Sequence, residues 1–125
     1  MTPHVRLKVK YGGGMSPETD WGKTGLDGYL DFKDDQLAVT LLSQTQQKVT
    51  THEVPDLRFI SYERAEVGFR TGSLVTVGFQ DGEGRFLIRE PVHEIRQRLD
   101  NAARDCPSLP PLLQEGPPPT PTRPF

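Results

Sequence analysis

Short β-prone segments separated by turn residues fill most of the chain, and a single helical pattern follows them. The clearest segment is residues 5–11, where the apolar side chains of Val5, Leu7, Val9 and Tyr11 alternate with basic ones. Alternation with a period of two is typical of a strand that has one buried and one exposed face. Many such strands in succession favour a small antiparallel sheet that curves or closes on itself.

The remaining strand patterns are separated by recognisable turn residues. They cover residues 29–32, 37–42, 49–54, 57–62, 66–70, 74–79 and 85–89. Asp34-Asp35 fits the turn of a hairpin, and we expect Thr71-Gly72 to form a second turn. Residues 12–28 hold six glycines, one proline and the only tryptophan, so we expect a long exposed connection there.

One amphipathic helix is predicted after the strands. Pro91 is well suited to open it, because a missing N–H group costs least at a helix start. Its apolar stripe consists of Val92, Ile95, Leu99 and Ala102. We expect the helix to end near Asp105 and to pack on the sheet. The predicted fold class is therefore mainly β, a curved antiparallel sheet or barrel of about seven strands capped by this C-terminal α-helix.

A proline-rich tail follows the predicted domain, which we place at residues 1–106. Eight of the 19 residues in 107–125 are proline, which removes backbone donors. We expect this tail to be disordered with polyproline II character. Its three P-x-x-P spacings fit either a plain solvated tail or a ligand for a polyproline-binding domain.

Composition favours a small protein of the cytoplasm. The formal net charge is -2, with 15 basic and 17 acidic residues, so no strong attraction to nucleic acid or anionic lipid is expected. Cys106 is the one cysteine, which leaves no partner for an intramolecular disulfide. The sequence shows neither a signal-peptide pattern nor an apolar run of membrane-spanning length.

The motifs for catalysis and cofactor binding are incomplete. Gly22-Lys23-Thr24 resembles the end of a phosphate-binding loop, but Pro17 occupies the position of the required first glycine. The histidines, His4, His52 and His93, lack the spacing of zinc ligands. We therefore expect no metal, no cofactor and no enzymatic activity.

Several local patterns resemble the pleckstrin-homology-like superfold, including its GRAM-type and bacterial variants. The order of about seven strands and one closing helix is similar to that group. Four local segments are also similar to that group: the first strand that ends in glycines, the strand Gly28–Phe32 with its acidic turn, the step at Val54–Leu57, and Val77–Gly82 followed by Phe86. The resemblance covers roughly residues 4–104.

The resemblance implies a non-catalytic binding module for a protein or peptide. The possible partner contacts are Lys8, Lys10, Tyr11, Trp21 and Lys23. Trp21 either folds over an open end of the barrel or projects as a contact anchor.

Two alternatives remain open at the level of sequence. One is a peripheral membrane adaptor that binds anionic lipid headgroups through Lys8, Lys10 and Lys23. Acidic residues between these lysines, Glu18, Asp20 and Asp27, argue against it. The other alternative is a small-barrel binder of single-stranded nucleic acid, which needs exposed aromatic side chains beside basic ones.

Overall fold

The computed structural model describes residues 5–14, 25–33, 36–42, 49–53, 57–67, 70–79, 82–107 and 110–117. The strands before the helix are β1 (Val5–Gly14), β2 (Asp27–Lys33), β3 (Gln36–Leu42), β4 (Val49–Glu53), β5 (Leu57–Val67), β6 (Arg70–Phe79) and β7 (Gly82–Ile88). The helix α1 (Val92–Asp105), a 3-10 turn η2 (Pro110–Leu112) and the strand β8 (Leu113–Glu115) follow. The predicted mainly β fold with one helix after seven strands is confirmed.

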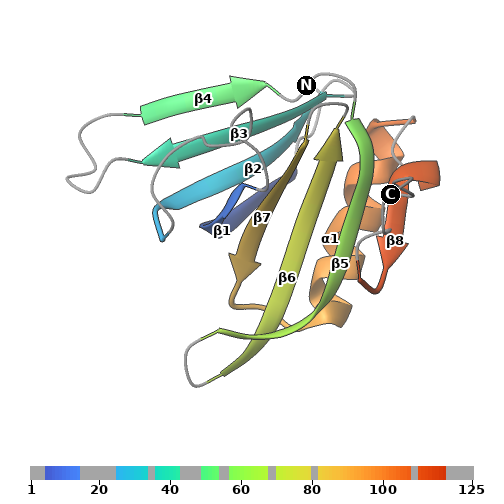
Figure 1. The fold of residues 1–125 in the computed structure, drawn as a ribbon. Coiled ribbons are helices and arrows are strands. Elements are labelled where there is room, and N and C mark those ends of the chain that lie inside the picture. The colour runs from blue at the N-terminus through green and yellow to red at the C-terminus, as the bar shows by residue number, and fades with distance from the viewer. Residues whose placement is uncertain are drawn as a thin grey trace, which may run out of the picture.

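The strands form one eight-stranded sheet in the order β4-β3-β2-β1-β7-β6-β5-β8. Six of the neighbouring pairs are antiparallel, and β5 with β8 is parallel, so the sheet is mixed and not purely antiparallel as predicted. The sheet bends strongly, so that β1 to β4 run across the direction of β5 to β7 (Figure 1). Since β4 and β8 are its two edges, the sheet is open, and the barrel that we considered is not formed by the described strands.

The inner face of the bent sheet forms the core. Alternation places one set of side chains there from β1 to β3 and from β5 to β7, as the register pairs Leu7 with Leu30 and Tyr11 with Phe86 show. The buried apolar strand residues are Leu7, Val9, Tyr11, Leu30, Phe32, Leu37, Val39, Leu41, Ile60, Tyr62, Val75, Val77, Phe86 and Ile88. The strands β1 to β3 and β5 to β7 therefore contribute side chains to one common core.

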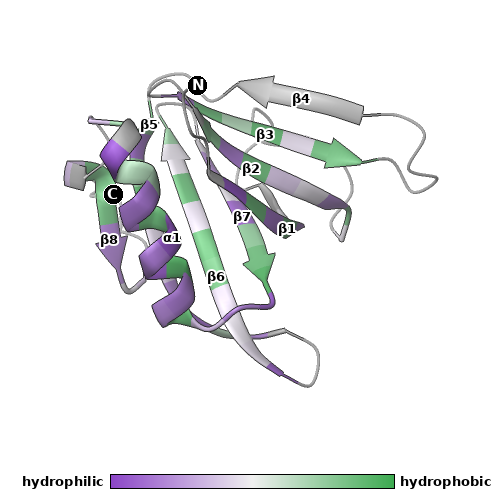
Figure 2. Ribbon diagram, turned by 180° about the vertical axis from the view of Figure 1, so that it is seen from behind, coloured by the Kyte–Doolittle hydropathy of each residue, from purple (hydrophilic) through white to green (hydrophobic). Residues whose placement is uncertain are grey.

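Helix α1 completes this core. It lies against β5 and β6 and reaches β1 and β2. Ile95 and Leu99 are fully buried and Ala102 is 1% exposed, which confirms the predicted stripe. Figure 2 shows mainly hydrophilic residues on the side of α1 that faces away from the sheet. The helix ends at Asp105, as expected, and buried Cys106 follows it.

The glycines after Tyr11 belong to a strand, which corrects part of the expected connection. Gly13 and Gly14 pair with Arg85 and Gly84 of β7, after an irregularity in register beyond Tyr11. A Cβ atom on Gly12 would lie 3.2 Å from the carbonyl oxygen of Arg85. Absence of a side chain therefore lets the two strands approach closely. The prediction that the long exposed connection begins at Gly12 is therefore wrong for residues 12–14.

The hairpin formed by β5 and β6 also differs from the prediction. β5 continues to Val67, and Arg70 already pairs with it at the start of β6. Gly72 lies within β6 opposite Ala65, so the expected turn at Thr71-Gly72 is absent. The expected short strand at 66–70 is instead divided between the two arms of one long hairpin.

The start of the tail is ordered as well, which corrects the prediction that 107–125 lacks regular structure. η2 and β8 follow the helix, and Leu113 pairs with Ile60 of β5. The prolines of this segment do not interrupt the pairing, because β8 is an edge strand and contains no proline itself. The last residues, 118–125, lie outside the described part of the chain.

Candidate functional site

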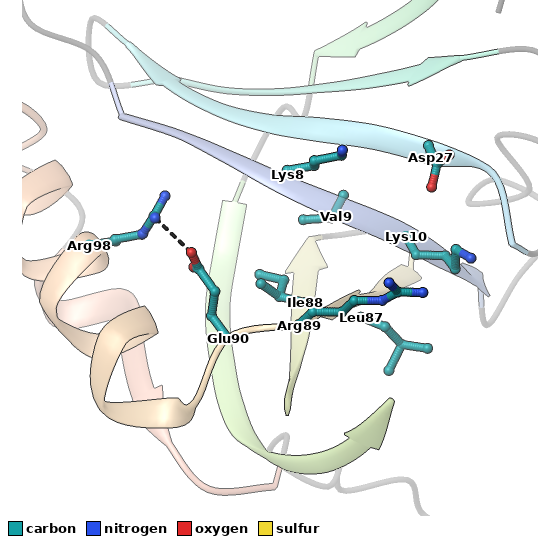
Figure 3. Close-up of a pocket in the computed structure, with 9 residues that line it drawn as sticks. All are labelled: Lys8, Val9, Lys10, Asp27, Leu87, Ile88, Arg89, Glu90 and Arg98. Carbon is teal, nitrogen blue, oxygen red and sulfur yellow. Dashed lines mark hydrogen bonds and ion pairs between the residues drawn. The ribbon is translucent and has the colours of Figure 1, made fainter. Parts of the chain in front are cut away.

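A groove opens where β1 separates from β7. The two strands pair from Lys10 and Leu87 onward to Gly14 and Gly84, but the preceding part of β1 pairs only with β2 among the described strands. The start of α1 lies beyond the end of β7. The space between these elements has a volume of about 580 Å³ (Figure 3). It is lined by Lys8, Val9, Lys10, Asp27, Leu87, Ile88, Arg89, Glu90 and Arg98.

The lining combines an apolar base with charged walls. Val9 is 3% and Ile88 is 2% exposed, so both belong to the core beneath the groove. Leu87 is half-buried beside them. The walls carry four cationic side chains against two carboxylates, those of Asp27 and Glu90. The groove therefore suits a ligand that is both acidic and partly apolar.

Three of the cations are available to a ligand. Lys8 and Lys10 stand on the outer face of β1, because Val9 between them points into the core. Arg89 is exposed at the end of β7. Ion pairs in the described part of the chain are Arg6 with Asp31 and Arg98 with Glu90. Lys8, Lys10 and Arg89 are thus unpaired among the described residues.

The fourth cation, Arg98, is paired with Glu90, which also lines the groove. Its guanidinium donates a hydrogen bond to Glu90 Oε1 at 2.6 Å (Figure 3). The backbone of Glu90 is fixed in turn, because Ser73 Oγ donates to its carbonyl oxygen at 2.7 Å. These contacts join β6, the β7–α1 connection and α1 at one side of the groove.

Arg6 lies on the same strand and outer face as the lysines but is already occupied. Its Nε donates to Asp31 Oδ1 at 2.7 Å, and its guanidinium stands 4.8 Å from the centre of the Tyr29 ring. The hydrogen bond to Asp31, followed by the attraction of that carboxylate, raises the pKa of Arg6. Arg6 therefore serves as an internal comparison for the unpaired cations.

Of the predicted contact residues, the structure brings Lys8 and Lys10 together at the groove. Tyr11 is wrong as a contact: it is 1% exposed, and its ring packs 5.8 Å from that of Phe86. Its position, one residue after Lys10, turns it to the inner face. Trp21 and Lys23 lie outside the described residues.

Sequence reasoning missed the other side of the groove. Leu87, Arg89 and Arg98 are far from β1 in the chain and reach the groove only through the pairing of β1 with β7. A weak signal was present for Arg98, which lies off the apolar stripe of the helix. The sequence contained no signal that β1 and β7 would be neighbours.

The described residues contain no group of three or more His, Cys, Asp or Glu side chains that could hold a metal ion. None of their helices is long and apolar enough to cross a membrane.

No protein-family model, curated protein or solved structure matches the chain. The groove is therefore the feature of the molecule from which a function can be inferred.

Proposed function

We propose that this protein is a non-catalytic binding module whose groove takes up an acidic segment of a protein or peptide. The observation that carries the proposal is the set of unpaired cations, Lys8, Lys10 and Arg89, around a groove with an apolar base. A carboxylate that enters gains charge-assisted hydrogen bonds from side chains that need not first give up an ion pair. Apolar atoms of the same ligand contact Leu87 and the core beneath it.

The order of elements supports the family resemblance behind this proposal. Seven strands followed by one helix agree with a pleckstrin-homology-like domain, and that resemblance implies binding rather than catalysis. We also place the module in the cytoplasm, since a chain with one cysteine, Cys106, forms no intramolecular disulfide and is compatible with a reducing compartment.

A peptide fits the groove better than the two alternatives do. Asp27 in its wall repels a densely anionic membrane surface or a polyphosphate backbone, whereas Glu90 is already paired with Arg98. Single-stranded nucleic acid also needs aromatic rings for stacking. Tyr11 is in the core, and Arg6 lies over the ring of Tyr29, the residue opposite Lys8 in the register.

Binding of a labelled peptide built from glutamate and leucine tests the proposal by fluorescence anisotropy. We expect Lys10→Gln and Arg89→Gln each to weaken binding about three- to tenfold, which corresponds to ~1 kcal/mol per exposed charge contact. Arg6→Gln is the matched control, because Asp31 already occupies that guanidinium. It should change the affinity less than twofold by the same reasoning.

The proposal is contradicted if the peptide does not bind, or if Arg6→Gln weakens binding as much as Lys10→Gln does. A peptide in which glutamine replaces glutamate should bind much more weakly. Tighter binding to vesicles that contain phosphoinositides, or to single-stranded DNA, than to the peptide would favour the corresponding alternative instead.

A further inference from the structure

The outer edge of β5 is covered by a short strand from the tail. β8 pairs with β5 over three positions, Ile60 with Leu113, Ser61 with Gln114 and Tyr62 with Glu115. Immediately afterwards the N–H of Gly116 donates to the carbonyl oxygen of Tyr62 at 2.9 Å. β5 itself is 11 residues long, so most of its edge is not paired with β8.

The attachment of β8 depends on few contacts. Leu113 is its apolar anchor and packs, partly buried, against the core. Gln114 and Glu115 are exposed, and β8 pairs with β5 alone among the described strands. An element with one apolar anchor and a three-residue ladder belongs to the parts of a fold that open at low cost in free energy.

The surface around β8 is shared with the helix. The charges of Glu115 on β8 and of Arg96 and Asp100 on α1 all act on the phenol of Tyr62. These side chains therefore lie near enough to the phenol of Tyr62 to influence its charge. Figure 2 shows β8 beside α1, along the edge of the sheet. An extended chain here meets backbone groups of β5, an apolar contact at the position of Leu113 and an exposed arginine.

We propose that the β5 edge is a second binding site, which takes a peptide strand of a partner protein in place of β8. The ligand is an extended segment with an aliphatic residue at the position of Leu113 and polar residues after it, the pattern of the chain's own Leu113-Gln114-Glu115. Backbone pairing supplies the affinity, and the apolar contact with the core at the position of Leu113 supplies the selectivity. The tail is then an intramolecular competitor.

This site is separate from the groove. β6 and β7 lie between β5 and β1 in the sheet, and neither β8 nor its partners on β5 line the groove. The second proposal therefore stands or falls independently of the first. A Lys10→Gln variant should leave binding at the β5 edge unchanged.

The test uses the full chain and a labelled synthetic peptide with the sequence of residues 110–117. Gln114→Pro weakens the tail's own pairing, because proline cannot donate to a ladder. Gly116→Val acts differently: Gly116 has a φ of 119°, a conformation that valine adopts poorly, and no atom lies within 4 Å of the added Cβ. Neither substitution changes a residue of β5 or α1. Gln114→Ala is the control.

We expect both variants to bind the peptide at least about tenfold more tightly than the wild type, whose tethered tail competes at a high effective concentration. Amide signals of Ile60 to Tyr62 should shift on binding. A peptide with aspartate in place of Leu113 should not bind. The proposal is overturned if the peptide binds no better to the variants than to the wild type. It is also overturned if light scattering shows that the variants or the wild type pair through exchanged tails, since a second copy is then the occupant.

Discussion

At the scale of single residues, Tyr62 shows how burial and charge act on one group. The side chain is 7% exposed, and its pKa is raised above the ordinary value of 10.0, first by burial and then by the nearby carboxylate of Glu115. The unfolded chain therefore loses this proton at a lower pH than the folded chain does. As pH rises above about 10, the contribution of Tyr62 to the free energy of unfolding declines.

Replacement of Tyr62 by phenylalanine should reduce the decline in the free energy of unfolding at high pH. Urea denaturation at neutral pH and above about pH 10 measures the free energy of unfolding in both proteins. We expect it to fall less steeply with pH in Tyr62→Phe than in the wild type, with a difference of at most ~1.4 kcal/mol per pH unit. Equal slopes in the two proteins would show that Tyr62 is not shielded from water in the folded state.

Also at the scale of single residues, two neighbouring positions of β1 differ in their environment, because successive side chains of a strand point to opposite faces of the sheet. Lys10 lines the groove, whereas Tyr11 packs on Phe86. The alternation in residues 5–11 already contained this distinction, because Tyr11 continues the apolar series of Val5, Leu7 and Val9. The prediction of Tyr11 as a contact followed its aromatic chemistry rather than its position in the pattern.

At the scale of elements, α1 is the cover of the core, and Leu99 tests its contribution. Leu99 is fully buried on the apolar stripe. Leu99→Ala should lower the free energy of unfolding by about 2–5 kcal/mol, through lost apolar burial and the cavity that remains. Gln97→Ala, on the exposed side of the same helix, should change it by less than about 0.5 kcal/mol. An unchanged melting temperature in Leu99→Ala would contradict the placement of α1.

Strong local periodicity explains which elements were predictable. The hairpin of β2 and β3 and the helix follow from alternation, turn residues and a helical stripe, all within short windows of sequence. β8 could not be found this way, because three residues carry no periodic signal and its position depends on the free edge of β5. The length of the β5–β6 hairpin likewise depends on cross-strand pairing, which kept Gly72 inside a strand.

At the scale of the whole molecule, the candidate site lies where β1 separates from β7. Lys8 and Lys10 were recognisable as a basic outer face of one strand, and both line the groove. The opposite wall, with Arg89 and Arg98, required the neighbourhood of β1, β7 and α1, elements that are distant in sequence. Composition alone had pointed away from any basic site, since the net charge is -2.

The central claim is that an acidic, partly apolar peptide binds in this groove. Titration of the isotope-labelled full chain with the glutamate–leucine peptide, followed by NMR, tests it most directly. We predict that amide shifts concentrate at Lys8, Lys10, Leu87, Arg89 and Arg98, and that added salt weakens the binding. Shifts confined to other surfaces, such as the β5 edge at Ile60 to Tyr62, or no shifts at all, would contradict the account.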